Sequence, residues 1–147
     1  MKTLTYSIRI NAPRKKVWQH MLDPLDYRRW TQPFSPNSEF IGEWEQGATI
    51  KFIDPSMGGT KATLDEVAPH ERLKARHIAI INKDGTEDVS SELARTWIGS
   101  TEMYIFNDTD GSTELHIEIC THKDYEEMFN AGWPQALEIL KTICEEG

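Results

Sequence analysis

The last stretch of the chain, from Asp124 to Glu146, limits most strongly what this sequence can fold into. Apolar side chains recur there at three- and four-residue spacing, which predicts one long helix with a wide apolar face. The recurring positions are Tyr125, Phe129, Trp133, Ala136, Leu140 and Ile143, with Met128 and Leu137 beside them. We expect Asp124 to cap the helix and Pro134 to kink it. A helix with such a face must bury it against another layer of the protein.

The start of the chain predicts one strand and then a pair of short helices. Residues 4–10 alternate apolar and polar side chains, as a strand with one buried face does. Asn11 is placed to cap a helix that begins near Pro13. A second short helix is expected to follow Asp23 and to run to about Trp30.

The middle of the chain predicts the sheet against which the long helix packs. Strand-like runs separated by turn signals lie at residues 40–44, 48–53, 60–67, 72–81, 96–106 and 113–120. The sequence Asp108-Thr109-Asp110-Gly111 is a hairpin signal. Residues 86–95 are polar and predict a loop or an irregular edge. Consecutive strands joined by short turns predict an antiparallel meander, so the predicted fold class is α+β.

The order of elements and a set of short motifs resemble one known superfamily. The motifs are Ile10-x-Ala12-Pro13-x-x-x-Val17-Trp18, Trp30-x-x-Pro33-Phe34, Gly42-x-Trp44-x-x-Gly47, Phe52-x-Asp54-Pro55, Trp97-x-x-x-x-Glu102-x-Tyr104 and Phe129-x-x-x-Trp133-Pro134. They resemble START-like (SRPBCC) proteins with the helix-grip fold. Within that superfamily they look most like the bacterial AHSA-type homologues of the activator of the ninety-kilodalton heat-shock chaperone ATPase.

The resemblance carries expectations about architecture. It implies a curved antiparallel sheet, of about six or seven strands, wrapped around a long C-terminal helix. It also implies two short helices after the first strand. Residues 1–147 are expected to form a single START-like domain.

Three functions from different classes are compatible with this resemblance. Relatives in the wider superfamily bind lipids, sterols, polyketides and plant hormones, and some catalyse cyclisation. A binding module that encloses a small apolar or aromatic molecule between sheet and helix is therefore the leading interpretation. The alternatives are a cyclase or dehydratase, and a protein-interaction domain that regulates a chaperone. Chaperone contact is not favoured, because the established activator carries a separate N-terminal domain that makes most of that contact.

Charge and composition exclude several partners. The net charge is −8 and the isoelectric point about 5.1, which disfavours nucleic acid and an anionic membrane surface. The 2 cysteines read as reduced thiols, and the N-terminus has no apolar run typical of a signal peptide, so a cytoplasmic location is expected. The irregular segment 86–95 offers an edge to a second copy, and we expect a monomer or a weak homodimer.

A polar pair is predicted inside the apolar cavity. His77 shares its strand parity with Leu73 and Ala75, so its side chain should point toward the concave face. The family pattern favours Glu102 and Tyr104 inward on a neighbouring strand. We hypothesise that His77 and Glu102 meet there, as an acid and base or as a polar anchor for a ligand. The alternative is a buried pair that only fixes the register of the strands.

Aromatic side chains are the second group of candidate site residues. Ligand pockets are lined mainly by apolar and aromatic groups. The candidates are Trp30, Phe34, Trp44, Phe52, Trp97, Tyr104, Phe129 and Trp133. The Pro-flanked loop at Phe34 could form the mouth of the cavity, and Phe129 and Trp133 its helical wall. For any single aromatic, ordinary core packing is the alternative interpretation.

No metal or cofactor is expected. The 5 histidines are scattered, and Cys120-x-His122 supplies too few ligands for zinc. Met57-Gly58-Gly59 predicts a turn, since a phosphate loop would be followed by Gly-Lys-Ser/Thr and a helix. The sequence also has no nucleophile elbow.

Overall fold

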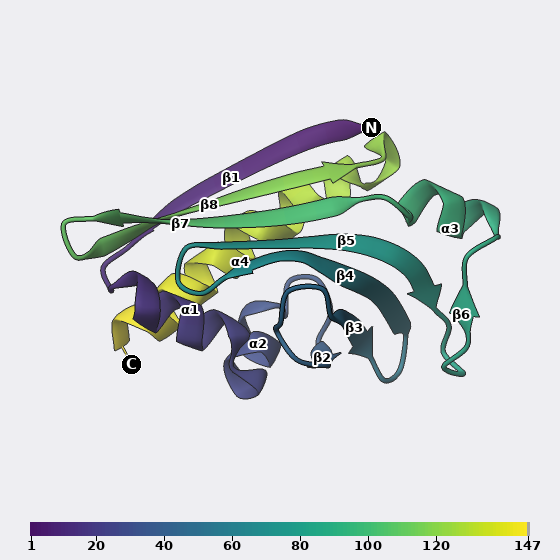
Figure 1. The fold of residues 1–147 in the computed structure, drawn as a ribbon, viewed down its shortest axis with the longest axis horizontal. Helices are drawn as coiled ribbons and strands as arrows, with labels where there is room; N and C mark the ends of the chain where they lie inside the picture. Colours follow the sequence, from purple (N-terminus) through teal and green to yellow (C-terminus); the bar gives the residue numbers. More distant parts are fainter. Residues whose placement is uncertain (147) are drawn as a thin grey trace.

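In the computed structural model, which describes residues 1–146, an antiparallel sheet curves around one long helix (Figure 1). The strands are β1 (Lys2–Ile10), β2 (Glu39–Ile41), β3 (Thr49–Asp54), β4 (Gly58–Ala68), β5 (Arg72–Ile81), β6 (Glu87–Asp88), β7 (Thr101–Thr109) and β8 (Ser112–Thr121). The helices are α1 (Arg14–Leu22), α2 (Pro24–Trp30), α3 (Glu92–Trp97) and α4 (Glu126–Glu146), with a 3-10 turn at Lys123–Tyr125. The predicted α+β helix-grip architecture is thereby confirmed.

The sheet is 8-stranded, in the order β1-β8-β7-β5-β4-β3-β2, with β6 paired to β5 at one side. Every pairing is antiparallel, as the short turns predict. β5 has the predicted bounds, and it adjoins β7. The predicted hairpin joins β7 to β8, and Asp110 and Gly111 take φ values of 56° and 89° there. A two-residue hairpin turn of type I′ requires positive φ at both central residues.

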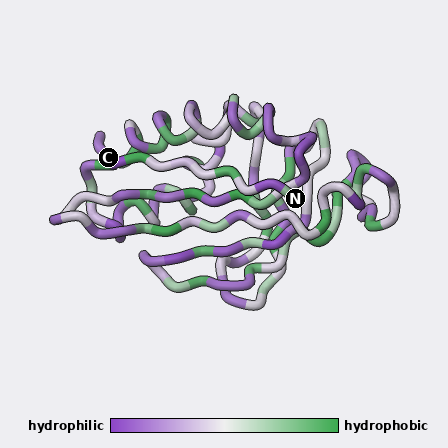
Figure 2. The backbone as a smooth tube through the Cα atoms, turned by 90° about the horizontal axis from the view of Figure 1, so that it is seen from above, coloured by the Kyte–Doolittle hydropathy of each residue, from purple (hydrophilic) through white to green (hydrophobic). Residues whose placement is uncertain are grey.

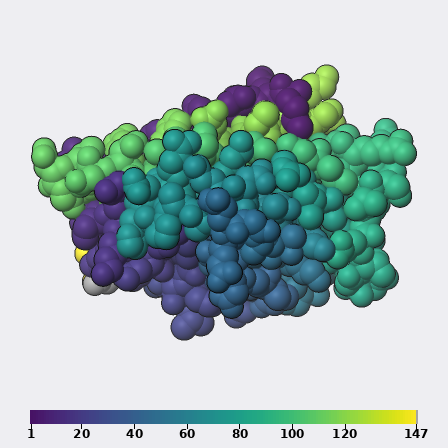
Figure 3. All heavy atoms as spheres, viewed as in Figure 1, coloured from purple at the N-terminus to yellow at the C-terminus, as the bar shows by residue number. Residues whose placement is uncertain are grey.

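The segment between β5 and β7 differs from its prediction. Instead of a loop at 86–95 and a strand from Thr96, the chain forms the short strand β6 and the helix α3, and β7 begins only at Thr101. The Ser91 hydroxyl caps α3 by accepting the Ala94 N–H, and α3 buries Ala94 and Trp97 three residues apart. Local capping therefore overrides the strand-like composition near Trp97. β6 and α3 form one end of the molecule (Figures 1 and 3).

Two of the predicted helix caps are wrong. Pro13, not Asn11, occupies the N-cap position of α1, and no side chain within residues 1–146 caps that end. Asn11 instead donates its backbone N–H to Glu145. At the far end of the chain, the His122 ring accepts the Asp124 N–H, so Asp124 is the residue being capped.

Helix α4 runs unbroken through Pro134, and hydrophilic and hydrophobic residues alternate along it (Figure 2). Its buried residues are Phe129, Gly132, Trp133, Ala136, Leu137, Leu140, Ile143 and Cys144. The predicted apolar face is confirmed from Phe129 onward, whereas Met128 is 48% exposed and Tyr125 lies in the 3-10 turn before α4. Within residues 1–146, none of the helices combines the length and apolar character needed to cross a membrane.

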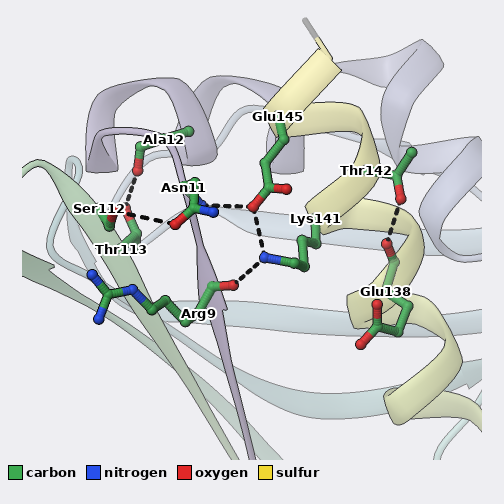
Figure 4. A network of polar contacts seen from close by, with 9 residues as sticks. All are labelled: Arg9, Asn11, Ala12, Ser112, Thr113, Glu138, Lys141, Thr142 and Glu145. Carbon is green, nitrogen blue, oxygen red and sulfur yellow. Dashed lines mark hydrogen bonds and ion pairs between the residues drawn. The ribbon is translucent and has the colours of Figure 1, made fainter.

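Polar contacts fix the C-terminal end of α4 to the start of the fold (Figure 4). The Lys141 ammonium donates to the Arg9 carbonyl at 2.7 Å and to Glu145 at 2.6 Å. These donors, first Lys141 and then the Asn11 N–H, hold the pKa of Glu145 below its usual value. Nearby, Thr113 donates its hydroxyl proton to Ala12.

Candidate functional site

A cavity of about 770 Å³ lies between the sheet, α2 and the N-terminal half of α4. The structure brings the predicted site residues, with the exception of Trp44, onto the wall of this one cavity. These residues are Trp30, Phe34, Phe52, His77, Trp97, Glu102, Tyr104, Phe129 and Trp133. Their contact with a ligand stays a prediction, while their assembly around one space is a fact of the fold.

Trp44 is an exception among the aromatic candidates. Within the part of the chain that the structure describes, it is not among the lining residues. It packs behind the wall instead, with its ring centroid 5.2 Å from Phe40 and 5.8 Å from Phe52. Trp44 therefore supports the wall and does not face the cavity.

The helical wall is built from interlocking rings. Phe34 packs edge-on against Phe129 and Trp133, with ring centroids at 6.3 Å and 5.3 Å. Trp133 also faces Trp30 at 5.8 Å. Phe34 comes this close because position 132 is glycine: a Cβ there would clash with the Phe34 ring. The glycine thus sets how deeply the Phe34 loop enters the cavity.

Asp54 holds that loop in place. It is only 4% exposed, and its carboxylate accepts hydrogen bonds from Ser35, from Ser56 and from the Asn37 N–H. The Ser35 hydroxyl and then Ser56 lower the pKa of Asp54 to about 2. Sequence reasoning found Asp54 only as part of a family motif, although it anchors the Phe34 loop to the end of β3.

Exposed apolar side chains mark where the cavity meets the surface. Met57, Leu93 and Met128 all line it, and they are 65%, 57% and 48% exposed. Sequence analysis missed Leu93 because α3 was predicted as a loop. It also missed Tyr27, a buried lining residue three positions before Trp30 on the same face of α2. Helical spacing was the signal that could have found Tyr27.

His77 and Glu102 lie together on the concave face. His77 is 2% exposed and belongs to the buried alternation of β5, as parity predicts. Its Nε2 is 3.5 Å from a Glu102 oxygen, and Tyr104 donates its hydroxyl proton to the other oxygen at 2.9 Å. The turn after α3 bonds to the His77 backbone through Gly99 and Ser100, which brings Trp97 beside the imidazole. The ring centroids of His77 and Trp97 are 4.7 Å apart.

The electrostatics of this group favour a charged carboxylate beside neutral phenols. Burial alone would raise the pKa of Glu102, but His77 and Tyr104 outweigh burial, and the pKa lies below its usual value. Burial, and then the charge on Glu102, raises the pKa of Tyr104 well above 10. The same causes raise the pKa of Tyr27. At neutral pH Glu102 is therefore an acceptor, and both phenols keep their protons.

Several buried donors around the cavity have no hydrogen-bond partner among residues 1–146. They are the imidazole of His77, whose neutral form carries one N–H and one acceptor nitrogen, and the indole N–H groups of Trp97 and Trp133, here called the donor cluster. The contact of 3.5 Å between His77 Nε2 and Glu102 does not count as a hydrogen bond. Leaving a buried donor unpaired costs about 1–3 kcal/mol, so native proteins rarely do it without a reason. A polar group on a bound molecule would be such a reason.

Metal ligands do not gather in the described part of the chain, where no group of three or more His, Cys, Asp or Glu side chains could hold an ion. The cavity instead offers aromatic walls, the carboxylate of Glu102 and several donors. Such an arrangement can orient an organic molecule by hydrogen bonds.

Comparison with family models identifies this architecture. Residues 1–117 match the model described as "Polyketide cyclase / dehydrase and lipid transport". The chain belongs to this family. The match covers strands β1 to β7 and the first part of β8. It confirms the START-like resemblance of the sequence. Among curated proteins, no match to the sequence is found.

Solved structures share the fold of this family member at low identity. Protein MLL2253 from Mesorhizobium loti is 16% identical, with a TM-score of 0.74 over 99% of this chain and 98% of that chain. The Aha1 dimer from Colwellia psychrerythraea is 18% identical, with a TM-score of 0.71 over 99% and 97%. CalU16 from Micromonospora echinospora is 18% identical, with a TM-score of 0.65 over 96% and 73%. At these identities the likeness shows the fold alone.

Proposed function

We propose that this family member acts as a single domain that binds a small, largely apolar or aromatic molecule in the cavity beside α4. One observation carries the proposal: the aromatic wall, Glu102 and the side chains of the donor cluster line the same space of about 770 Å³. Natural ligand pockets span roughly 300–1,000 Å³ and combine apolar walls with a few placed polar groups. The family description, with its cyclases, dehydrases and lipid transport, supports ligand binding in general.

Binding is favoured over acid–base catalysis by the direction of the pKa shifts. A general acid or base works best when its pKa lies near the operating pH. The pKa of Glu102 is lowered and that of Tyr104 is raised, so both shifts lead away from neutrality. Glu102 therefore fits a polar anchor better than the acid or base of a cyclase or dehydratase.

The protein-interaction alternative receives less support from this interior. A domain that acts only through its surface has no need of a cavity containing unpaired donors, which lower stability. The Aha1 neighbour is a dimer, which keeps a weak homodimer among the predictions for this chain. A cytoplasmic location likewise stays a prediction.

Thermal unfolding in the presence of a panel of apolar and aromatic metabolites tests the proposal. A ligand that binds only the native state, at 100-fold above its dissociation constant, adds about 2.7 kcal/mol of stability. We expect at least one such ligand, and we expect His77→Ala and Glu102→Ala to weaken its effect.

His116→Ala is the matched control for this screen. His116 lies on β8, contacts Ser7 and is not a lining residue within residues 1–146. A ligand whose stabilisation falls equally in His116→Ala and His77→Ala would place its binding outside the cavity. A broad panel without any hit would contradict the proposal.

A further inference from the structure

We propose that the cavity selects an uncharged ligand with a hydroxyl group, and that Glu102 excludes ligands with a carboxylate head. This inference rests on the proposed function and names the chemical class that the same site takes. It makes Glu102 a specificity-determining residue. It separates hydroxylated aromatic or polycyclic molecules from fatty acids and aromatic acids.

The donor cluster requires an oxygen acceptor on the ligand. His77 is 2% exposed, Trp133 2% and Trp97 8%, and their ring nitrogens are buried without a partner among residues 1–146. His77 and Trp97 are adjacent, with ring centroids 4.7 Å apart, and both line the cavity. A ligand oxygen can accept from an imidazole N–H or an indole N–H once binding brings it within reach of one of these nitrogens. A pure hydrocarbon would leave all these donors unpaired in the bound state.

Glu102 requires a donor on the same ligand. One of its oxygens accepts the Tyr104 hydroxyl proton at 2.9 Å, while the other is 3.5 Å from His77. The second oxygen keeps the capacity to accept a proton from a bound group. A carbonyl or an ether can accept but not donate. A hydroxyl group does both, so a single hydroxyl can bridge the donor cluster and Glu102.

The charges around the cavity disfavour an anion. Among the described lining residues, the formal charges are those of Asp54, Lys83 and Glu102, and His77 can add one more. Lys83 is exposed at the rim, and Asp54 is held by serines. In the interior, Glu102 with a neutral His77 carries one negative charge, and with a protonated His77 the pair is neutral. Neither state offers the net positive charge that a desolvated carboxylate needs.

Three naphthalene probes of nearly equal size test this inference: 2-naphthol, 2-naphthoate and 2-methylnaphthalene. At pH 7.5 the naphthol is uncharged, since phenols have a pKa of about 10, whereas the carboxyl group is ionised. Calorimetric titration should show the naphthol binding at least about tenfold more tightly than either analogue, because the methyl group leaves buried polar groups unpaired and the carboxylate meets Glu102.

Glu102→Gln removes the charge and keeps the shape of the side chain. We expect it to reduce the preference for naphthol over naphthoate by about tenfold or more. Glu43→Gln makes the same charge change at an exposed position away from the cavity and should leave the preference unchanged. Thermal unfolding checks that Glu102→Gln folds. The probe preference of the unaltered protein tests the inference even if that variant does not.

The outcomes separate this inference from the proposed function. Naphthoate or methylnaphthalene binding as tightly as naphthol to the unaltered protein would overturn the selectivity and leave the cavity a binding site. A preference for naphthol that persists in Glu102→Gln would overturn the role of Glu102. Failure of all three probes to bind would count against both proposals.

Discussion

The two halves of α4 meet the same sheet in different ways. The C-terminal half buries Leu137, Leu140 and Ile143 in the hydrophobic core, and within residues 1–146 none of these lines the cavity. The N-terminal half presents Phe129 and Trp133, which face a space of about 770 Å³. One continuous helix thus has a close-packed aliphatic end and an open aromatic end. The room for a ligand therefore lies beside the aromatic end of the helix, while the aliphatic end is filled by its own core.

Polar groups follow the same division. At the packed end, Thr113, Lys141 and the Asn11 N–H all have hydrogen-bond acceptors (Figure 4). At the open end, the donor cluster has none within the described residues. Buried polar groups without hydrogen-bond partners occur mainly at functional sites, where binding requires them although they lower stability. The packed end should therefore govern stability, and the open end should govern recognition.

The largest effect is expected from truncation at the packed end. Leu140 is fully buried, so Leu140→Ala should lower the free energy of unfolding by about 2–5 kcal/mol through lost burial and the cavity it leaves. Urea denaturation measures this directly. The affinity for a cavity ligand should stay within about threefold, because the aromatic end keeps its shape. A variant that folds with normal stability, or one that remains stable but no longer binds, would break the proposed division.

The opposite sign is expected at the open end. Replacing both polar partners, in the double variant His77→Phe with Glu102→Leu, removes the buried pair and fills the site with apolar atoms. Such replacements are neutral or stabilising by about 1–4 kcal/mol in other proteins. We expect unchanged or raised stability by urea denaturation, together with loss of ligand binding. Strong destabilisation of the double variant would instead assign the pair a purely structural role.

How much the sequence could predict follows the same division. Helical spacing in 124–146 and the Asp110-Gly111 turn lead directly to α4 and the β7–β8 hairpin, because periodicity and turn chemistry act locally. Strand parity was enough to place His77 inward. The residues of the aromatic wall could be named because the resemblance supplied the fold.

Other features depend on contacts that sequence patterns do not reveal. The polar composition of α3 predicted a loop. The helix forms because the Ser91 hydroxyl caps it and Trp97 packs on His77, and neither contact can be read from composition. Trp44 looked like a lining residue, yet it lies behind Phe52. The unpaired donors of the cavity emerge only when three separate elements are brought together, and no local pattern encodes that.

A smaller effect is expected at the entry to α1. Thr113 is fully buried and donates its hydroxyl proton to the Ala12 carbonyl at 2.8 Å. Thr113→Val keeps the volume but leaves that carbonyl without this donor, and it should cost about 1 kcal/mol. Thr113→Ser, which keeps the hydroxyl, is the matched control. Equal stability of the valine variant and the unaltered protein would show that this bond contributes nothing net.

A pH-dependent effect concerns the acid stability of the Phe34 loop. The pKa of Asp54 is about 2 in the folded protein and 3.8 for an unperturbed aspartate. Its contribution to stability is therefore complete above about pH 4 and is lost as the pH falls toward 2. Thermal unfolding between about pH 6 and pH 2 should show the gap between the unaltered protein and Asp54→Asn closing over that window. A gap that is constant with pH would contradict the role of the ionised Asp54.

The central claim is that the aromatic end of α4 is where this protein binds its ligand, and tryptophan signals can report on it directly. Trp97 and Trp133 line the cavity, so their indole N–H resonances report on it, whereas Trp18 packs against Phe106 and is not a lining residue within residues 1–146. In an NMR titration with 2-naphthol, assigned through Trp97→Phe and Trp133→Phe, the Trp97 and Trp133 signals should shift to saturation while the Trp18 signal stays fixed. Binding that moves the Trp18 signal and leaves the Trp97 and Trp133 signals in place would contradict the account.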